Sequence, residues 1–357
     1  MDFNITITQV SRRYFGYALS EPLVLHTTLG IAAVMWSILV PDPIKARNEG
    51  YKLKALAIPA IQARLQRNDT SNIVVGAIAN MAQLDASDRN FEAAKLHLNG
   101  LKRIAETRGG YDDFKEDSDI GTTINWSDVL IAIGTNSKPT MPLLVDTDSS
   151  FLPASVLRDA ETPSLSHLRV FEETPHDTKI RFAIAAVRQG YYASRSEAPV
   201  SDMRIACNVA DHGLTTLVQD VPRTSLAHPL LIAAQIFSIL VCRSTDVACP
   251  LVGSLRPRLV QSLQERMGRM LENREYWSGL TWCLWMGLVS TAPRSRESQY
   301  FSRQLAELIP KLRFGDSEQF KLVMQRFLWD DVRCDMTLQR YKTTFFPSKD
   351  GPVAADE

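Results

Sequence analysis

The 357 residues contain 40 Lys and Arg against 40 Asp and Glu, so the formal net charge is zero. Nucleic-acid phosphates are held by clustered positive charge, and this balance argues against a chain that holds nucleic acid by itself. Hydrophobic residues make up 45% and charged residues 22% of the chain, which is typical of a globular protein with an ample core.

Five scattered cysteines argue against a disulfide framework. Their number is odd, most lie inside apolar runs, and no C-x-x-C pair occurs. A reducing compartment is therefore expected. The set consists of Cys207, Cys242, Cys249, Cys283 and Cys334.

Three stretches without formal charge, residues 22–41, 224–242 and 276–293, are long enough to span a bilayer. Each contains several polar residues, and buried helices of a large all-α core produce the same pattern. We interpret all three as core helices and expect no membrane partner. Association with a membrane is kept as an alternative.

Apolar residues at helical spacing predict an all-α fold, and they recur through most of the first 137 residues. Residues 1–20 are expected to form an N-terminal extension. In the second predicted helix Leu53, Leu56, Ile61 and Leu65 should face inward, and Pro59 should kink or split the helix. The predicted helices cover residues 22–39, 44–67, 72–87, 90–108 and 123–135.

A proline-rich connection, residues 138–175, separates this half from a second helical half, residues 176–345. A short helix is expected near 153–158, and residues 346–357 should be a disordered tail. The whole of 21–345 is expected to be one large helical domain, built from antiparallel helical hairpins in two packed halves, 21–137 and 176–345. Further helices are predicted near 180–191, 203–214, 226–243, 254–272, 276–291, 296–313 and 317–327.

The helix over residues 90–108 carries an unusual stripe that begins at His97 and ends at Arg108. Gly109 and Gly110 should stop this helix, because glycine readily adopts the left-handed turn that ends a helix. Buried polar groups need partners, and Asp128, in the next helical segment, is the nearest candidate acid. We therefore predict a buried ion pair between Arg108 and Asp128.

These residues also carry a resemblance. The stretch H-L-N-G-L-K-R-I-A-E-T-R-G-G (97–110), followed by I-N-W-S-D (124–128) and the prolines Pro139 and Pro142, resembles the fungal-specific transcription factor domain. Residues 20–33 are similar to the first helix of that family, and residues 327–331 to its C-terminal end. The motif residues are His97, Arg108, Gly109, Gly110, Trp126 and Asp128.

The resemblance implies an all-helical regulatory domain without catalysis or cofactor. It implies action through protein partners, such as a zinc-cluster transcription factor or a second copy, or through a small-molecule effector. It also implies a nuclear location, with the cytoplasm as the alternative. The family's zinc cluster needs six N-terminal cysteines, and none precedes Cys207. DNA binding is therefore expected from a partner or from a segment outside this chain.

An enzyme of terpene-cyclase type is the main alternative function. Asp112 and Asp113, with Asp117 in Y-D-D-F-K-E-D, are similar to the D-D-x-x-D motif that holds Mg²⁺ against a diphosphate in that family. The spacing is one residue too long, and the family's second metal-binding motif is missing. We interpret the three acids as a solvated loop.

Two further clusters have a structural and a functional interpretation. Arginines interleaved with glutamates between residues 256 and 275 predict a solvated helix face. The aromatic residues Tyr276, Trp277, Trp282 and Trp285 are interpreted as core, with an apolar ligand pocket as the alternative. His97 is interpreted as a hydrogen-bonded histidine of the core rather than a metal ligand, because no second ligand lies at metal spacing.

Overall fold

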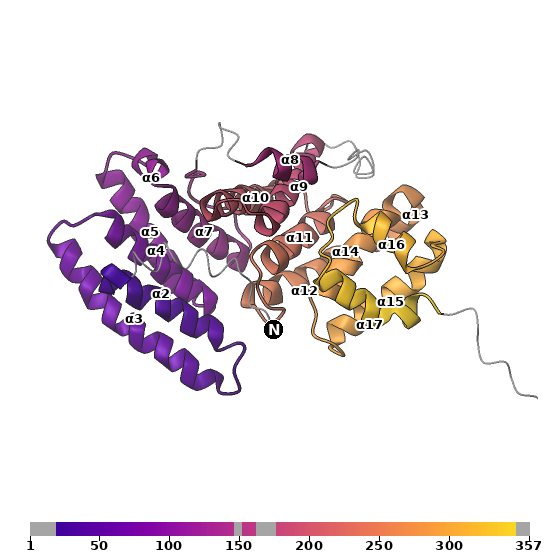
Figure 1. Cartoon of the computed structure of the whole chain (residues 1–357), viewed down its shortest axis with the longest axis horizontal. Helices are drawn as coiled ribbons and strands as arrows, with labels where there is room; N and C mark the ends of the chain where they lie inside the picture. The colour runs from indigo at the N-terminus through magenta and orange to yellow at the C-terminus, as the bar shows by residue number, and fades with distance from the viewer. Residues whose placement is uncertain (1–18, 146–151, 162–175, 348–357) are drawn as a thin grey trace, which may run out of the picture.

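The computed structural model (Figure 1) describes residues 19–145, 152–161 and 176–347, and all regular structure in these ranges is helical, as predicted. The first helices are α2 (Pro22–Trp36), α3 (Pro43–Gln66), α4 (Asn72–Ser87), α5 (Phe91–Thr107), α6 (Asp112–Glu116) and α7 (Ser118–Thr135). They are followed by α8 (Ala154–Ala160), α9 (Asp177–Arg195), α10 (Val200–Asp220), α11 (His228–Phe237) with the π-helical η2 (Ser238–Cys242), and α12 (Pro250–Gln264). The last are α13 (Met267–Glu272), η3 (Arg274–Tyr276), α14 (Trp277–Val289), α15 (Arg296–Leu308), η4 (Ile309–Leu312), α16 (Ser317–Met324) and α17 (Arg333–Phe345).

Helix α7 joins the two halves of the molecule. It packs against α4, α5 and α6 on one side and against α10 and α12 on the other. Its residues from Ile120 to Ile133 are buried on every side of the helix, apart from the partly exposed Trp126, so its neighbours enclose it. The main hydrophobic core is continuous through both halves and surrounds α7, and a small second cluster lies where α8 meets α9 and α10.

Helix α3 lies at the outer edge of the molecule and packs mainly on α2 (Figure 1). The helix continues through Pro59, so of the predicted kink or split the split does not occur. The inward orientation predicted for Leu56 and Leu65 is wrong, because these side chains are 56% and 37% exposed. A helix with so few neighbours buries only a narrow face, here around Ala57 and Ile61.

The aromatic residues around α14 belong to the core, as predicted. Trp282 and Trp285 are fully buried, and the ring of Trp285 stacks on Trp329 with centroids 5.6 Å apart and an interplanar angle of 3°. Tyr276 and Trp277 pack against the same core but remain partly exposed. Trp329 precedes α17, a helix that the sequence analysis did not predict.

The solvated face predicted for the arginines of residues 256–274 is wrong for its inner members. Arg266 is 4% exposed and donates to the carbonyl oxygens of Ser225 and Ser262. Arg258 donates to the carbonyl oxygens of Ile133 and Gly134, near the C-terminal end of α7. A guanidinium carries five N–H donors, so it can satisfy the carbonyl groups that a helix end leaves unpaired.

Several predictions concern residues outside the described ranges. The predicted N-terminal extension and the predicted tail lie almost wholly outside them, and so do residues 146–151 and 162–175 of the proline-rich connection. Helix α8 corresponds to the short helix expected near 153–158. Among the helices of the described ranges, none combines the length and the apolarity needed to cross a bilayer.

The tight packing of α7 gives a first testable prediction. A Cβ added at Gly121 would lie 2.2 Å from the carbonyl oxygen of Leu144 and 2.8 Å from that of Phe114. Both are backbone atoms, so relieving the clash requires the backbone to shift. Gly121→Ala should therefore lower the free energy of unfolding by about 2 kcal/mol or more. Gly100→Ala, which meets nothing within 4 Å inside α5, should raise it by about 0.5–1 kcal/mol. Denaturant unfolding of both variants checks the sign of each change.

Candidate functional site

His97 links three helices through one buried acid. Its Nε2 lies 3.1 Å from Oδ2 of Asp85 on α4, while Lys54 of α3 forms an ion pair with Oδ1 of the same carboxylate. Burial alone would raise the pKa of Asp85, but the hydrogen bonds from His97 and Lys54 outweigh it and hold this pKa below its usual value. His97 is hydrogen-bonded as predicted, with 26% of its side chain still exposed.

Arg108 fastens the end of α5 to the start of α4. Its guanidinium donates to Oδ1 of Asn72 at 2.9 Å and to the carbonyl oxygen of Thr70 at 3.4 Å. It also lies 3.4 Å from a carboxylate oxygen of Asp113 and 4.8 Å from the centre of the Phe114 ring. Gly109 and Gly110, with φ angles of 88° and 131°, follow at the predicted helix end.

The predicted ion pair between Arg108 and Asp128 is wrong. Helices α5 and α7 run antiparallel, and Asp128 is level with Leu98 and Lys102 of α5. Arg108 lies six residues beyond Lys102, which is about 9 Å further along the helix axis. The two residues are therefore at different heights in the same hairpin, and each binds nearer groups.

Asp128 holds the chain that follows α7. Its carboxylate accepts hydrogen bonds from the backbone N–H groups of Thr140 and Met141, both at 2.7 Å, and from the Thr140 hydroxyl at 3.0 Å. Burial raises the pKa of Asp128, although these hydrogen bonds and the charge of Lys102 act in the opposite direction. One turn earlier, Asn125 donates to the carbonyl oxygen of Pro142 and accepts from the N–H of Leu144. The segment 140–144 is thus fixed along α7 by two side chains.

Trp126 contacts the second half of the molecule. The Arg243 guanidinium lies 4.1 Å from the centre of its ring, within the range of a cation–π interaction. Arg243 also forms an ion pair of 2.8 Å with Asp211 of α10, whose side chain is 2% exposed, and it donates to Asn208. The motif residue therefore covers a buried charge pair between α10 and η2.

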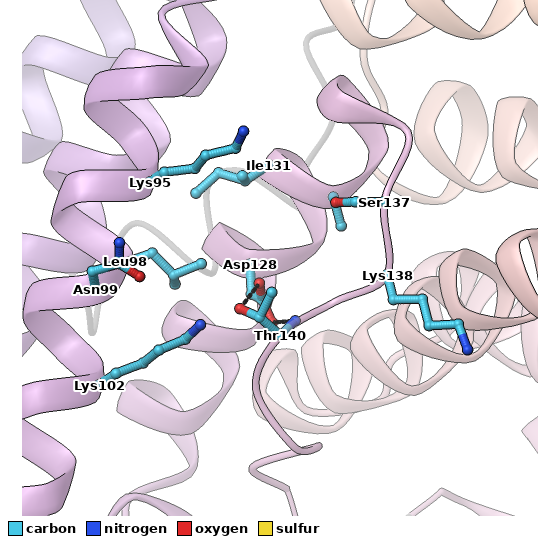
Figure 2. A pocket seen from close by; sticks show the side chains of 10 residues that line it. Lys95, Leu98, Asn99, Lys102, Asp128, Ile131, Ser137, Lys138 and Thr140 are labelled. Carbon is cyan, nitrogen blue, oxygen red and sulfur yellow. Dashed lines mark hydrogen bonds between the residues drawn. The ribbon is translucent and has the colours of Figure 1, made fainter.

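A shallow pocket opens beside Asp128, between α5 and the end of α7 (Figure 2). Lys102 points from α5 towards Asp128 and Thr140, whereas Lys138 turns away towards the neighbouring helix, where it pairs with Asp220. The volume of the pocket is about 150 Å³. Pockets that bind drug-sized molecules usually measure about 300–1,000 Å³, so this one has room for a small ion or a few water molecules. Its walls are formed by Lys95, Leu98, Asn99, Lys102, Asp128, Ile131, Ala132, Ser137, Lys138 and Thr140.

Two acids of the cyclase alternative lie at the surface, whereas the solvated loop predicted for the third is wrong: Asp117 is partly buried and caps the start of α7. The side chain of Asp112 is 92% exposed and pairs with Lys115 at 2.8 Å, while Asp113 is 54% exposed and pairs with Arg108. Both belong to the short helix α6 rather than to the loop that the sequence predicted. In the part of the chain that the structure describes, no group of three His, Cys, Asp or Glu side chains could hold a metal ion.

Comparison with models of known protein families, with curated proteins and with solved structures gives no match to this chain. The resemblance to the fungal-specific transcription factor domain therefore remains a prediction from the motif residues.

The sequence analysis missed the residues that complete this network: Asp85, Asn125, Asp211 and Arg243. Asp85 had a visible signal, because it is an acid within the otherwise uncharged helical run A-N-M-A-Q-L-D-A. An ionised group on a helix that is otherwise buried needs a partner of opposite charge. The identity of that partner depends on which helix lies alongside, and no local pattern contains this information.

The role of Asp128 can be tested by removing its carboxylate. In Asp128→Ala the backbone N–H groups of Thr140 and Met141 lose the oxygen that accepts from both of them. The free energy of unfolding should fall by about 2–3 kcal/mol. Asp112→Asn, at a side chain that is 92% exposed, should change it by less than about 0.5 kcal/mol. Equal stability of the two variants in urea unfolding would contradict the role assigned to Asp128.

The lowered pKa of Asp85 predicts a stability that is lost in acid. Because the folded-state pKa lies below the unfolded value of about 4, the contribution is complete above pH 4 and disappears as the pH falls through the folded-state pKa. The variant Asp85→Asn has no carboxylate to titrate at this position. The difference in unfolding free energy between the wild type and Asp85→Asn should therefore be largest near pH 6 and shrink towards pH 3. A difference that stays constant over this range would refute the assignment.

Proposed function

We propose that this chain is a non-catalytic transcriptional regulator of the fungal-specific transcription factor domain family that acts through protein contacts. One observation carries the proposal: the residues of the resemblance hold helices together. His97, Arg108, Trp126 and Asp128 each bind polar groups of neighbouring elements. A family of regulators that share one fold but bind different partners requires such a motif, because the residues that fix helix packing must stay the same when the partner changes.

The chemistry near the motif supports a scaffold better than an active site. Asp85 and Asp128 have their carboxylates occupied by several donors from the chain itself. The pocket beside Asp128 measures about 150 Å³, which leaves little space for an organic substrate or for a large effector. We therefore place the proposed action at protein surfaces rather than in this pocket.

The proposal assigns DNA binding to a partner. A formal net charge of zero gives no general attraction to phosphates, and a zinc-cluster transcription factor would supply the reading of the DNA sequence. On this proposal the protein works in the nucleus as a protein-binding module of such a complex, without a cofactor of its own.

A reporter assay tests the proposal without knowledge of the partner. The full chain is fused to a DNA-binding module of known site and expressed in fungal cells that carry a reporter gene behind that site. Reporter output should rise or fall several-fold relative to the module alone, because the fused chain brings its protein partners to the reporter gene and raises their local concentration there. Reporter output that does not change, with the fusion shown to be folded and nuclear, would contradict the proposal.

A matched variant separates regulation from the enzyme alternative. Asp112→Asn combined with Asp113→Asn removes the acids that a magnesium–diphosphate site would use, at side chains that are 92% and 54% exposed. The effect on the reporter should be retained in this double variant. Loss of the effect, with stability unchanged, would favour the enzyme instead.

A further inference from the structure

Exposed apolar side chains are concentrated on the first two helices of the described chain. Fourteen large apolar residues are exposed in the described ranges, and nine of them lie between residues 19 and 65. This concentration is larger than the scatter of single apolar residues that any protein surface carries. The nine are Leu19, Leu29, Trp36, Leu39, Ile44, Tyr51, Leu56, Ile58 and Leu65.

On α3 these residues form part of a regular line, which we call the α3 seam. Four apolar residues recur every seven positions, and one uncharged residue stands between each pair, so the spacing alternates between four and three residues. This is the spacing by which one helix packs against another in a coiled coil. All seven residues are exposed. They are Ile44, Asn48, Tyr51, Ala55, Ile58, Gln62 and Leu65.

The seam is open because α3 already buries a different face. Gly50, Ala57 and Ile61 point to the inside, where α3 meets α2 and α4. At 3.6 residues per turn the seam lies more than a quarter of a turn round the helix from that face, and α3 itself lies at the outer edge of the molecule (Figure 1). From Ile44 to Leu65 the seam extends about 30 Å at 1.5 Å per residue, which is enough for three heptads of a second helix.

The charges beside the seam select the kind of helix that fits. The four positions flanking its first half are all basic. Lys54 is bound to Asp85 and is only 20% exposed, which leaves Lys45, Arg47 and Lys52 to face an incoming helix. Arg47 and Lys52 remain 49% and 69% exposed in their ion pairs with Asp88 and Glu49. Surface pairs of this kind contribute little and can exchange partners. In a parallel pair a second copy of α3 would bring basic flank against basic flank. In an antiparallel pair the basic first half would face the uncharged flanking positions Pro59 and Ile61, so only an acidic helix would be attracted by charge.

We propose that the α3 seam is a docking site for an amphipathic helix of a partner protein, with apolar residues at heptad spacing and Glu or Asp beside them. A membrane surface fits less well, because lipid binding uses a broad apolar face rather than a narrow line at heptad spacing. The inference goes beyond the proposed function: it concerns how a partner is bound and holds whether or not that partner acts in transcription.

Two synthetic peptides of about four heptads test the proposal on the full chain. Both carry Leu at the core positions; one has Glu and the other Lys at the flanking positions, so that neither pairs readily with itself. By fluorescence anisotropy the acidic peptide should bind at least about tenfold more tightly than the basic one, and added salt should weaken it. Equal affinities, or no binding of the acidic peptide, would overturn the proposal.

Variants of exposed residues locate the site. Ile44→Ser with Ile58→Ser should weaken binding of the acidic peptide at least about tenfold, whereas Leu56→Ser, at a residue 56% exposed on α3 but off the seam, should leave binding unchanged. Lys45→Glu with Lys52→Glu should reverse the preference towards the basic peptide. A loss with Leu56→Ser as large as with the seam variant would refute the site. Sedimentation of the unmodified chain as a dimer that Ile58→Ser dissociates would show a second copy as the occupant and overturn the proposal.

Discussion

The burial of α7 on all sides is the constraint on which the rest of the structure depends. A helix surrounded by other helices cannot leave polar side chains without partners, since each unpaired group would cost about 1–3 kcal/mol or more. Asn125 and Asp128 meet this requirement by binding the backbone of segment 140–144, and Ser127 donates to the carbonyl oxygen of Ala79 on α4. The hydrogen bonds that satisfy the buried polar side chains of α7 thus also hold segment 140–144 and α4 against this helix.

Buried charges follow the same logic in both halves. Asp85 is neutralised between α3 and α5, and Asp211 is neutralised by Arg243 beneath Trp126. Removing one partner of such a pair is costly, because it leaves the other charge buried and uncompensated. The residues that look most reactive in the sequence therefore act in the structure as fixed links between helices, and this supports the proposed scaffold.

The outer helices are under a weaker constraint. Helix α3 has few neighbours, so only a narrow face must be apolar, yet further apolar residues remain on its exposed flank. Packing in the interior accounts for the residue types of α7, but it does not account for the apolar residues of the α3 seam, which are exposed. The structure thus combines tight packing at the centre with exposed apolar residues on an outer helix.

Helical periodicity and helix stops determined much of the fold from the sequence alone. Gly109 and Gly110 end α5, and Trp282 and Trp285 lie in the core, because these features depend on residues close in the chain. Only the tertiary structure decided the partner of Arg108, the exposure of Leu56 and the burial of Arg266. The spacing of apolar residues indicates which side of a helix is buried. It does not specify the position along the axis at which two helices meet, or how many helices surround each one. These two quantities determine which polar groups can reach one another.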